Sequence, residues 1–343
     1  MAGPDPALSC YLLDTRSLWP GERITQSASA LLPLLSPSEQ DSVTRKHFAR
    51  DARMSLASAL LKRFYIVRTI SVPWSRIHFS RLRDPIHGKP CLLSPTTNLP
   101  VATPSFNVTH QAGLVALIGS SRETTDVGID IVCVNERNDT LAIDRDGFGA
   151  WVDVYEDFFS EAELFDIKYS IPEPGITLLD GTQLSSADLG RHDRCVRRDQ
   201  LLTVIQTLPN GGRREVHFMS DILVDAKLRR FYAFWAYKEA YIKLTGEAML
   251  ASWLRDLEFR NVRAPGPGTV ARCSTLGVWG EKVRDAEVWL RGERVSDVRI
   301  ELQSFEEDYM IAVAVRGAEG VVPEMESVDV ERDVIPLTVE SVA

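Results

Sequence analysis

Two stretches of the chain carry apolar residues at the spacing of an α-helix. Between residues 52 and 68 they recur every three or four positions, at Leu56, Leu60, Phe64 and Val67. This repeat predicts a long core helix. The second stretch, from about Arg229 to Thr245, is dense in Phe, Tyr and Trp and is followed by Gly246, a residue typical of helix C-termini. Because this second helix has no purely polar face, we expect it to be packed on most sides.

Short apolar runs predict strands in between and after these helices. The runs at 9–14, 114–119 and 127–134 are bounded by turn-forming residues, and a polar turn joins the last two. Three further candidates, at 286–290, 297–302 and 309–315, close the fold. The pattern therefore predicts a mixed α and β chain.

Two segments show no such pattern. Residues 170–228 lose the apolar periodicity and are scattered with proline and glycine, so we expect a mobile insertion there. After Gly317 the chain is rich in Asp and Glu, and we expect residues 318–343 to form an acidic tail.

Composition excludes several classes of protein. The 343 residues include 39 Lys and Arg against 48 Asp and Glu, a net charge of −9, which argues against a nucleic-acid binder. The five cysteines are odd in number and never form C-x-x-C, so neither a disulfide framework nor a zinc site is indicated, and reduced thiols suit the cytoplasm. We find no signal peptide and no run near the ~20 apolar residues that cross a bilayer, and expect no membrane association.

A carboxylate stands in the middle of the predicted strand at 127–134. Val127, Ile129 and Ile131 point to one face, while Gly128, Asp130 and Val132 point to the other. An unpaired carboxylate on a covered strand is costly, so Asp130 should have a cation partner. A structural Asp bonded to a neighbouring loop or arginine remains an equal alternative to a functional one.

Trp235, Glu239 and Lys243 are spaced four residues apart and form one line along the aromatic helix. Glu before Lys at this spacing is also the commonest surface ion pair, which is worth only ~0.3–0.5 kcal/mol. The aromatic residues on all sides favour a functional site instead, because they place these charges in a packed environment.

Further polar residues are candidates for an anion site. Asn107, Thr109 and His110 directly precede a predicted buried strand, although an isolated histidine is more often a bonded core residue than a ligand contact. Arg50 and Lys89 would each be ordinary surface charges, but together they could bind phosphate groups. The chain has no Walker loop, no G-x-S-x-G elbow and no H-E-x-x-H helix.

The order of these motifs resembles a known family. FNVTH at 106–110, VGID at 127–130 and WAYKEAYIK at 235–243 are together similar to the 4′-phosphopantetheinyl transferases of the large, single-chain, surfactin-synthetase-activating type. Upstream, FARDA at 48–52 and GKP at 88–90 look like the coenzyme A contacts of that family. The resemblance extends from about residue 10 to 316 and is nearest to the fungal members.

The resemblance implies an α+β pseudodimer. Two similar α+β halves, residues 1–118 and 119–317, would hold coenzyme A in the cleft between them. The implied activity moves the phosphopantetheine arm of coenzyme A onto a serine of an apo acyl or peptidyl carrier protein and releases adenosine 3′,5′-bisphosphate. The implied partners are the carrier domains of fatty acid, polyketide and nonribosomal peptide synthases and of lysine biosynthesis, and we expect a monomer.

The resemblance also implies residue roles. Asp130 and Glu239 would bind Mg²⁺, Glu239 would accept the proton of the carrier serine, and Lys243 would stabilise the departing phosphate. Contacts to coenzyme A would come from Arg50, Arg83, Lys89, Asn107, Thr109, His110 and Lys243. Two positions depart from the family pattern. Val132 replaces a glutamate that is a third metal ligand in many bacterial members, and Thr109 replaces a commoner serine.

Two other functions remain open on sequence grounds. The fold could serve as a coenzyme A-binding or carrier-binding module without catalysis, although Asp130, Glu239 and Lys243 are all present. A Mg²⁺-dependent pyrophosphohydrolase is also possible, but the chain lacks the glutamate-rich helix expected of that class.

Overall fold

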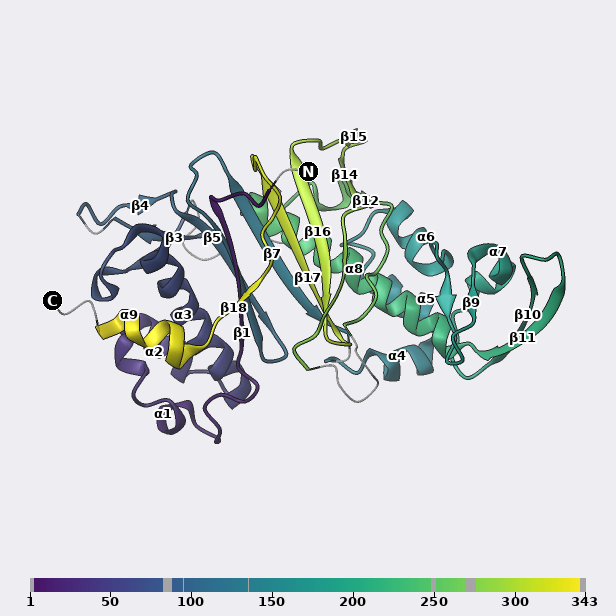
Figure 1. Ribbon diagram of the computed structural model, residues 1–343, viewed down its shortest axis with the longest axis horizontal. Coiled ribbons are helices and arrows are strands. Elements are labelled where there is room, and N and C mark those ends of the chain that lie inside the picture. Colours follow the sequence, from purple (N-terminus) through teal and green to yellow (C-terminus); the bar gives the residue numbers. More distant parts are fainter. Residues whose placement is uncertain are drawn as a thin grey trace.

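A computed structural model describes residues 3–82, 88–94, 96–134, 136–247, 251–268 and 276–339. Two four-stranded sheets lie face to face, and a long helix covers the outer face of each (Figure 1). Successive side chains along a strand point in turn to the space between the two sheets and to the helix on the outer face. Ile129 and Ile131 pack between the two sheets, whereas Val132 packs towards the second long helix. The expected alternation around Asp130 is confirmed.

The first sheet has the strand order β18-β1-β6-β5. Its strands are β1 (Leu8–Asp14), β5 (Ser105–Gln111), β6 (Leu114–Ser120) and β18 (Glu326–Ser327). Its outer face is covered by α3 (Ala49–Ile70), the helix predicted from the repeat at 52–68. A Cβ on Gly119 would lie 2.2 Å from the Tyr65 ring of α3, so the glycine lets the helix lie close to β6. The short helices α1 (Ile24–Ser27) and α2 (Pro37–Thr44) precede α3.

The second sheet has the order β13-β16-β17-β7, and its strands are all antiparallel. They are β7 (Asp126–Cys133), β13 (Trp279–Val283), β16 (Val298–Phe305) and β17 (Tyr309–Arg316). The aromatic helix α8 (Asp221–Thr245) crosses this sheet. A Cβ on Gly128 would lie 2.1 Å from the carbonyl oxygen of Ala240. The missing side chain therefore lets the α8 backbone touch β7 next to Asp130.

Smaller elements surround these layers. One three-stranded sheet contains β2 (Phe79–Arg81), β3 (Pro90–Leu93) and β4 (Pro100–Val101), and another contains β12 (Leu257–Arg260), β14 (Glu287–Leu290) and β15 (Glu293–Arg294). The helices α4 (Asp139–Asp146), α5 (Phe148–Asp153) and α6 (Glu161–Tyr169) follow β7. Within the described ranges no helix combines the length and apolarity that a membrane span requires.

The same order of elements occurs in both sheets. Each has a strand, a long helix and a hairpin, namely β1-α3-β5-β6 and β7-α8-β16-β17, and in each the first strand pairs antiparallel with the last. The structure contains both helices and sheets, so the mixed α and β class predicted from the sequence is confirmed. The two strands predicted on either side of residues 121–125 exist, but they belong to different sheets instead of forming one hairpin.

Residues 170–228 are not the structureless span that the sequence suggested. They contain β8 (Ile176–Thr177), β9 (Gln183–Leu184), α7 (Ser186–Leu189), β10 (Leu201–Thr207), β11 (Arg213–Met219) and the start of α8. These elements enclose a small apolar core that includes Leu184, Val204 and Phe218. Few apolar residues mark these elements, because β10 and β11 are largely exposed and β8 and β9 have only two residues each.

The acidic segment after Gly317 is also part of the fold, contrary to the expected tail. β18 pairs in parallel with β1, and a π-helical turn (Val330–Val334) with α9 (Ile335–Val339) follows it. Val328, Val330 and Val334 are buried in the core beneath α3, while acidic side chains between them face outward. The high content of Asp and Glu after Gly317 predicts an exposed tail, but it does not take account of the three spaced valines that are buried.

Candidate functional site

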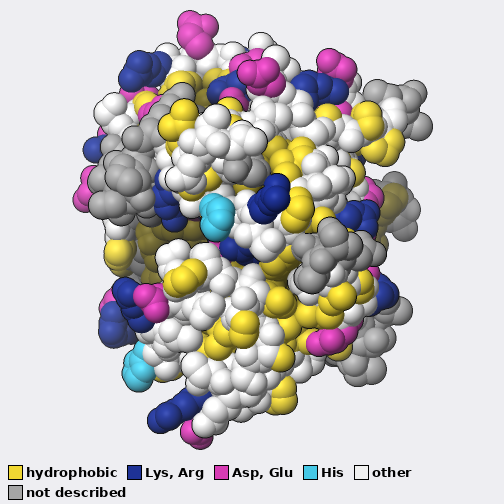
Figure 2. Space-filling view, turned by 90° about the vertical axis from the view of Figure 1, so that its left-hand side faces the viewer, with side chains coloured by type: hydrophobic (Ala, Val, Ile, Leu, Met, Phe, Trp, Pro, Cys, Tyr) yellow, Lys and Arg dark blue, Asp and Glu magenta, His cyan; other side chains and the backbone are white. Residues whose placement is uncertain are grey.

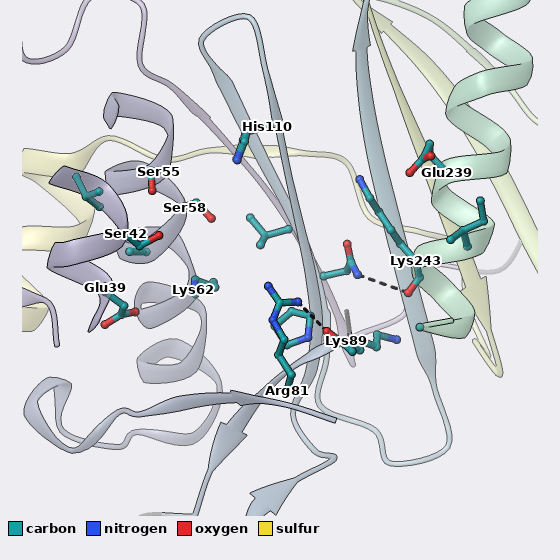
Figure 3. Close-up of a pocket in the computed structure, with 18 of the residues that line it drawn as sticks. Glu39, Ser42, Ser55, Ser58, Lys62, Arg81, Lys89, His110, Glu239 and Lys243 are labelled. Carbon is teal, nitrogen blue, oxygen red and sulfur yellow. Dashed lines mark hydrogen bonds between the residues drawn. The ribbon is translucent and has the colours of Figure 1, made fainter. Parts of the chain in front are cut away.

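A cavity of about 490 Å³ is lined by residues of both long helices, α3 and α8, and of β5. Its walls come from α2, α3, the segment before β3, β5 and α8 (Figure 3). Among the charged and titratable side chains of the described lining, basic ones outnumber the acidic Glu39 and Glu239; they are Lys46, Lys62, Arg81, Lys89, His110 and Lys243. On the molecular surface a histidine and several Lys and Arg side chains border a hollow on this side (Figure 2). Such a cavity suits a ligand with several negative charges.

Asp130 and Lys243 meet at one end of this region. The Lys243 ammonium is 2.5 Å from Oδ1 of Asp130 and donates to the Thr109 hydroxyl at 3.1 Å. Thr109 in turn donates to Oδ1 of Asp130 at 3.1 Å. Asp130 therefore has the cation partner that its place on a buried strand required, and β5, β7 and α8 each contribute one member of the group.

Glu239 lies one helical turn before Lys243 on α8 and lines the cavity (Figure 3). Its Oε1 atom is buried, and no described group forms a hydrogen bond with it. Burial, and next the charge of Asp130, raise the pKa of Glu239 to about 7, while Lys243 acts in the opposite direction. A carboxyl group with this pKa can accept or release a proton near neutral pH.

Asn107, His110 and Lys89 occupy the middle of the cavity wall. The Asn107 amide lies 3.5 Å from the carbonyl oxygen of Lys243, and its own Oδ1 is buried without a hydrogen bond from the described residues. Desolvation lowers the pKa of His110, a hydrogen bond with its own backbone acts in the opposite direction, and the Lys243 and Lys46 charges lower the pKa further. Lys89 reaches towards the C-terminus of α8, where its ammonium is 3.4 Å from the Leu244 carbonyl oxygen.

Not every predicted site residue joins this group. Arg50 does not line the cavity; it lies in a separate surface depression near Arg16 and Arg53, with its guanidinium beside Phe48. Arg83 lies outside the described residues. Trp235, although in line with Glu239 on α8, stacks on Phe158 at 4.3 Å between ring centroids.

Sequence reasoning missed several cavity residues. On α3 these are Ser55, Ser58 and Lys62, and on α2 they are Glu39 and Ser42. Lys46 follows the end of α2, and Arg81 lies at the end of β2. The α3 set carried a detectable signal, because its members recur at spacings of three and four residues within an otherwise apolar helix.

The carboxylates here fit a magnesium ion better than a transition metal. Within the described residues no group of three or more His, Cys, Asp and Glu side chains is placed to hold a metal. Val132 is buried against the α8 side of the sheet and supplies no ligand. Mg²⁺ usually takes only one or two carboxylates and completes its shell with water and substrate phosphates. The unpartnered Oε1 of Glu239, close to Asp130, is compatible with such a role.

Comparison with known proteins identifies the family. A family model described as 4′-phosphopantetheinyl transferase, N-terminal, matches residues 21–122. The chain is 55% identical over 335 residues to a 4′-phosphopantetheinyl transferase of Aureobasidium melanogenum, and the match covers 96% of each protein. The chain belongs to the 4′-phosphopantetheinyl transferase family.

Other relatives extend this result. 4′-Phosphopantetheinyl transferase A of Aspergillus fumigatus is 35% identical over 382 residues, covering 96% of this chain and 94% of that protein. The L-aminoadipate-semialdehyde dehydrogenase-phosphopantetheinyl transferase of Schizosaccharomyces pombe is 30% identical over 167 residues, 47% of this chain and 58% of the relative. As a phosphopantetheinyl transferase, the protein uses coenzyme A as co-substrate and transfers phosphopantetheine to carrier proteins.

Proposed function

We propose that the transferase binds coenzyme A in the cavity between α3 and α8, with the pyrophosphate beside Asp130, Glu239 and Lys243. The observation that carries this proposal is the meeting of two carboxylates and a lysine, from segments more than a hundred residues apart, at a cavity lined with basic groups. We also propose that the two sheets with their long helices are the halves of a pseudodimer, which the matching order β1-α3-β5-β6 and β7-α8-β16-β17 supports.

Mg²⁺ is the proposed metal, held by Asp130 and Glu239. When bound, it would neutralise charge on the pyrophosphate and polarise the phosphorus that is attacked. Two carboxylates would otherwise repel a pyrophosphate. Lys243 already neutralises Asp130 in the ion pair of 2.5 Å, so the site is built to balance negative charge.

Glu239 is the proposed general base. The hydroxyl oxygen of the carrier serine forms a new bond to the β-phosphorus, and the bond from that phosphorus to the oxygen of the α-phosphate breaks. The serine proton passes to Glu239, directly or through water, and adenosine 3′,5′-bisphosphate departs. In the protein without metal, burial and the Asp130 charge raise the pKa of Glu239 to about 7, so its surroundings favour proton uptake by the carboxylate.

The remaining polar residues are proposed to position the substrate. Lys243 would offer its charge to the departing phosphate, where electrostatic stabilisation contributes most to the rate. Thr109 holds the Lys243 ammonium in place, and Asn107, His110 and Lys89 would contact the nucleotide portion. Arg83 stays a predicted contact. Arg50 lies outside the cavity and is not included in this proposal.

The proposed acceptors are carrier domains of fatty acid, polyketide and nonribosomal peptide synthases. The name of the S. pombe relative adds the carrier domain of an L-aminoadipate-semialdehyde dehydrogenase as a further proposed acceptor.

The test is incubation of the protein with coenzyme A, Mg²⁺ and apo carrier domains from each of these enzyme classes. We expect intact-mass spectrometry to show carriers that have gained one phosphopantetheine group. Unchanged carriers from every class would contradict the proposal. Cleavage of coenzyme A without any carrier would instead indicate a pyrophosphohydrolase.

A further inference from the structure

The hairpin β10–β11 has one open edge. It lies at the far end of the molecule from α3 (Figure 1). The edge formed by β10 is covered, because α7 lies beside it and the Gln206 side chain donates to the carbonyl oxygen of Gln183 in β9. Along the other edge, no strand of the described structure pairs with β11.

The backbone of β11 can accept another strand at this edge. At the two ends of the hairpin, the Ser220 amide donates to the Gln200 carbonyl oxygen and the Leu208 amide donates to the Gly212 carbonyl oxygen. Because bonded pairs alternate along an antiparallel ladder, the even-numbered residues of β11 bond to β10. The amide and carbonyl groups of the odd-numbered residues of β11 therefore point to the open edge.

The β11 strand lacks most of the features that protect a strand edge from other chains. Its seven residues contain no proline, glycine or lysine, and their register with β10 has no bulge. A regular open edge of this kind is a template for pairing with another strand. Charged side chains on β11 therefore decide which strand can pair with it.

A second copy of β11 is complementary to this edge in one register. If two copies run antiparallel about a two-fold axis at Val216, all seven residues are paired. Glu215 then lies opposite His217 of the second copy, and Arg213 lies opposite Met219. Because the axis repeats each pair, both glutamates face an imidazole that can donate a hydrogen bond, and no like charges face each other.

Neighbouring registers are less favourable. An axis at Glu215 would place two glutamates opposite each other, and an axis at His217 would pair two histidines and leave fewer residues in the ladder. The side chains concerned are exposed and share one face, where His217 lies 3.8 Å from Glu215 of its own strand. The register at Val216 also joins odd-numbered residues to odd-numbered residues, as the open backbone groups require.

We infer that the protein self-associates through β11, with two hairpins joined about Val216 into one four-stranded antiparallel sheet. This inference goes beyond the proposed function and does not rest on it. Two seven-residue strands pair over about 23 Å and bury less than the roughly 1,200 Å² of a stable interface, so the dimer should be weak, with a Kd of about 10–500 µM. The monomer expected from the family resemblance would be the dilute form.

Sedimentation equilibrium of the full chain, from about 5 µM to about 500 µM, tests the inference. We expect the average mass to rise with concentration from 38.4 kDa, the mass of one chain, towards twice that value. A mass that stays at 38.4 kDa throughout this range overturns the inference.

A matched pair of proline variants tests the edge. His217→Pro removes an amide from the open edge, whereas Thr203→Pro removes one from the opposite edge of the hairpin. Both variants also lose the 2.9 Å hydrogen bond between these two side chains. His217→Pro removes two hydrogen bonds per dimer and should raise Kd at least about tenfold, while Thr203→Pro should change it less than about twofold. Equal Kd values for His217→Pro and the wild type overturn the inference.

Transfer activity shows whether these variants are folded. Glu239 lies 18 residues after the start of α8, which is about 27 Å along the helix from the hairpin. Dimerisation through β11 therefore leaves the candidate site open, and the activity per chain should be the same in the wild type and in both proline variants.

An exchange of charges tests the register and needs no proline. Glu215→Lys removes the acceptor opposite His217 of the second copy and should weaken the dimer. Adding His217→Glu to this variant places opposite charges across the interface again and should restore a Kd near that of the wild type. A double variant that dimerises no better than Glu215→Lys overturns the inference.

Discussion

Glu239 is the residue whose charge state depends most clearly on what surrounds it. In the protein without metal, the carboxyl is partly buried beside Asp130, and its pKa rises from 4.5 to about 7. A raised carboxyl pKa means that folding favours the protonated form, whose contribution to stability is complete below pH 4.5 and is lost as the pH rises through about 7. Bound metal would remove this penalty, because it gives the carboxylate a counter-charge.

This linkage predicts the behaviour of Glu239→Gln, which resembles the protonated residue. The free energy of unfolding of the metal-free wild type should fall relative to that of the variant between pH 5 and pH 8, by on the order of 2 kcal/mol. Chemical denaturation at several pH values measures this difference. Curves that stay parallel over this range would show that Glu239 is not held in a charge-disfavouring site.

At the scale of elements, α8 is fixed to its surroundings by buried cations. Lys238 forms a fully buried ion pair with Glu163 of α6 at 2.9 Å and also donates to the carbonyl oxygens of Leu254 and Leu257. Near the other end of α8, Lys227 donates to the carbonyl oxygens of Lys168 and Cys195. These bonds join α8 to the neighbouring segments at two places. They therefore help to hold the helix, and with it Glu239 and Lys243, in position relative to its surroundings.

Gly128 sets the distance between α8 and β7, and Gly128→Ala tests its importance. The added Cβ would lie 2.1 Å from the Ala240 carbonyl oxygen and 2.5 Å from the Leu244 amide nitrogen, so the helix would have to move. We expect a loss of about 1–3 kcal/mol in stability, and lower transfer activity in the protein that still folds. Thermal denaturation and an activity assay measure the two effects.

Gly149→Ala is the matched control, because its nearest neighbouring atom would be 3.9 Å away and the site is helical. It should be neutral or stabilise the protein by up to about 1 kcal/mol. If Gly128→Ala were as harmless as Gly149→Ala, close approach of α8 to β7 would not be needed for the site.

At the scale of the whole molecule, the C-terminal segment returns to the first sheet, where β18 pairs in parallel with β1 (Figure 1). A protein that ends at Gly317 would lose β18 and the buried side chains of Val328, Val330 and Val334. Each buried valine contributes about 1.5–3 kcal/mol, so the truncated protein should be several kcal/mol less stable and should lose activity at temperatures that the full chain tolerates.

Thermal denaturation and residual transfer activity after heating measure this effect. The control ends at Val339, which retains every one of these contacts and should match the full chain. Equal melting temperatures for the full chain and the protein ending at Gly317 would show that the segment contributes nothing to the fold.

The sequence predicts those parts of the fold whose pattern is local. The apolar repeat of α3, the alternation in β7 and the aromatic run of α8 specify their own elements. It does not predict the hairpin β10–β11 or the β18 segment, because their few apolar residues become meaningful only beside β8, α7 or α3. The same limit applies to the site. Asp130, Glu239 and Lys243 stood out within their motifs, but Lys62 is an ordinary helical lysine until the cavity around it is known.

In the proposed mechanism, Asp130 and Glu239 would share one divalent cation with the pyrophosphate of coenzyme A. The most direct test of this mechanism is the rate of phosphopantetheine transfer at increasing Mg²⁺ concentration, for the wild type, for Glu239→Gln and for Glu161→Gln, an exposed control on α6. We predict saturable Mg²⁺ dependence in the wild type and the control, and a rate at least about 100-fold lower in Glu239→Gln at every Mg²⁺ concentration. Near-normal transfer by Glu239→Gln, or full wild-type activity with all divalent cations chelated, would contradict it.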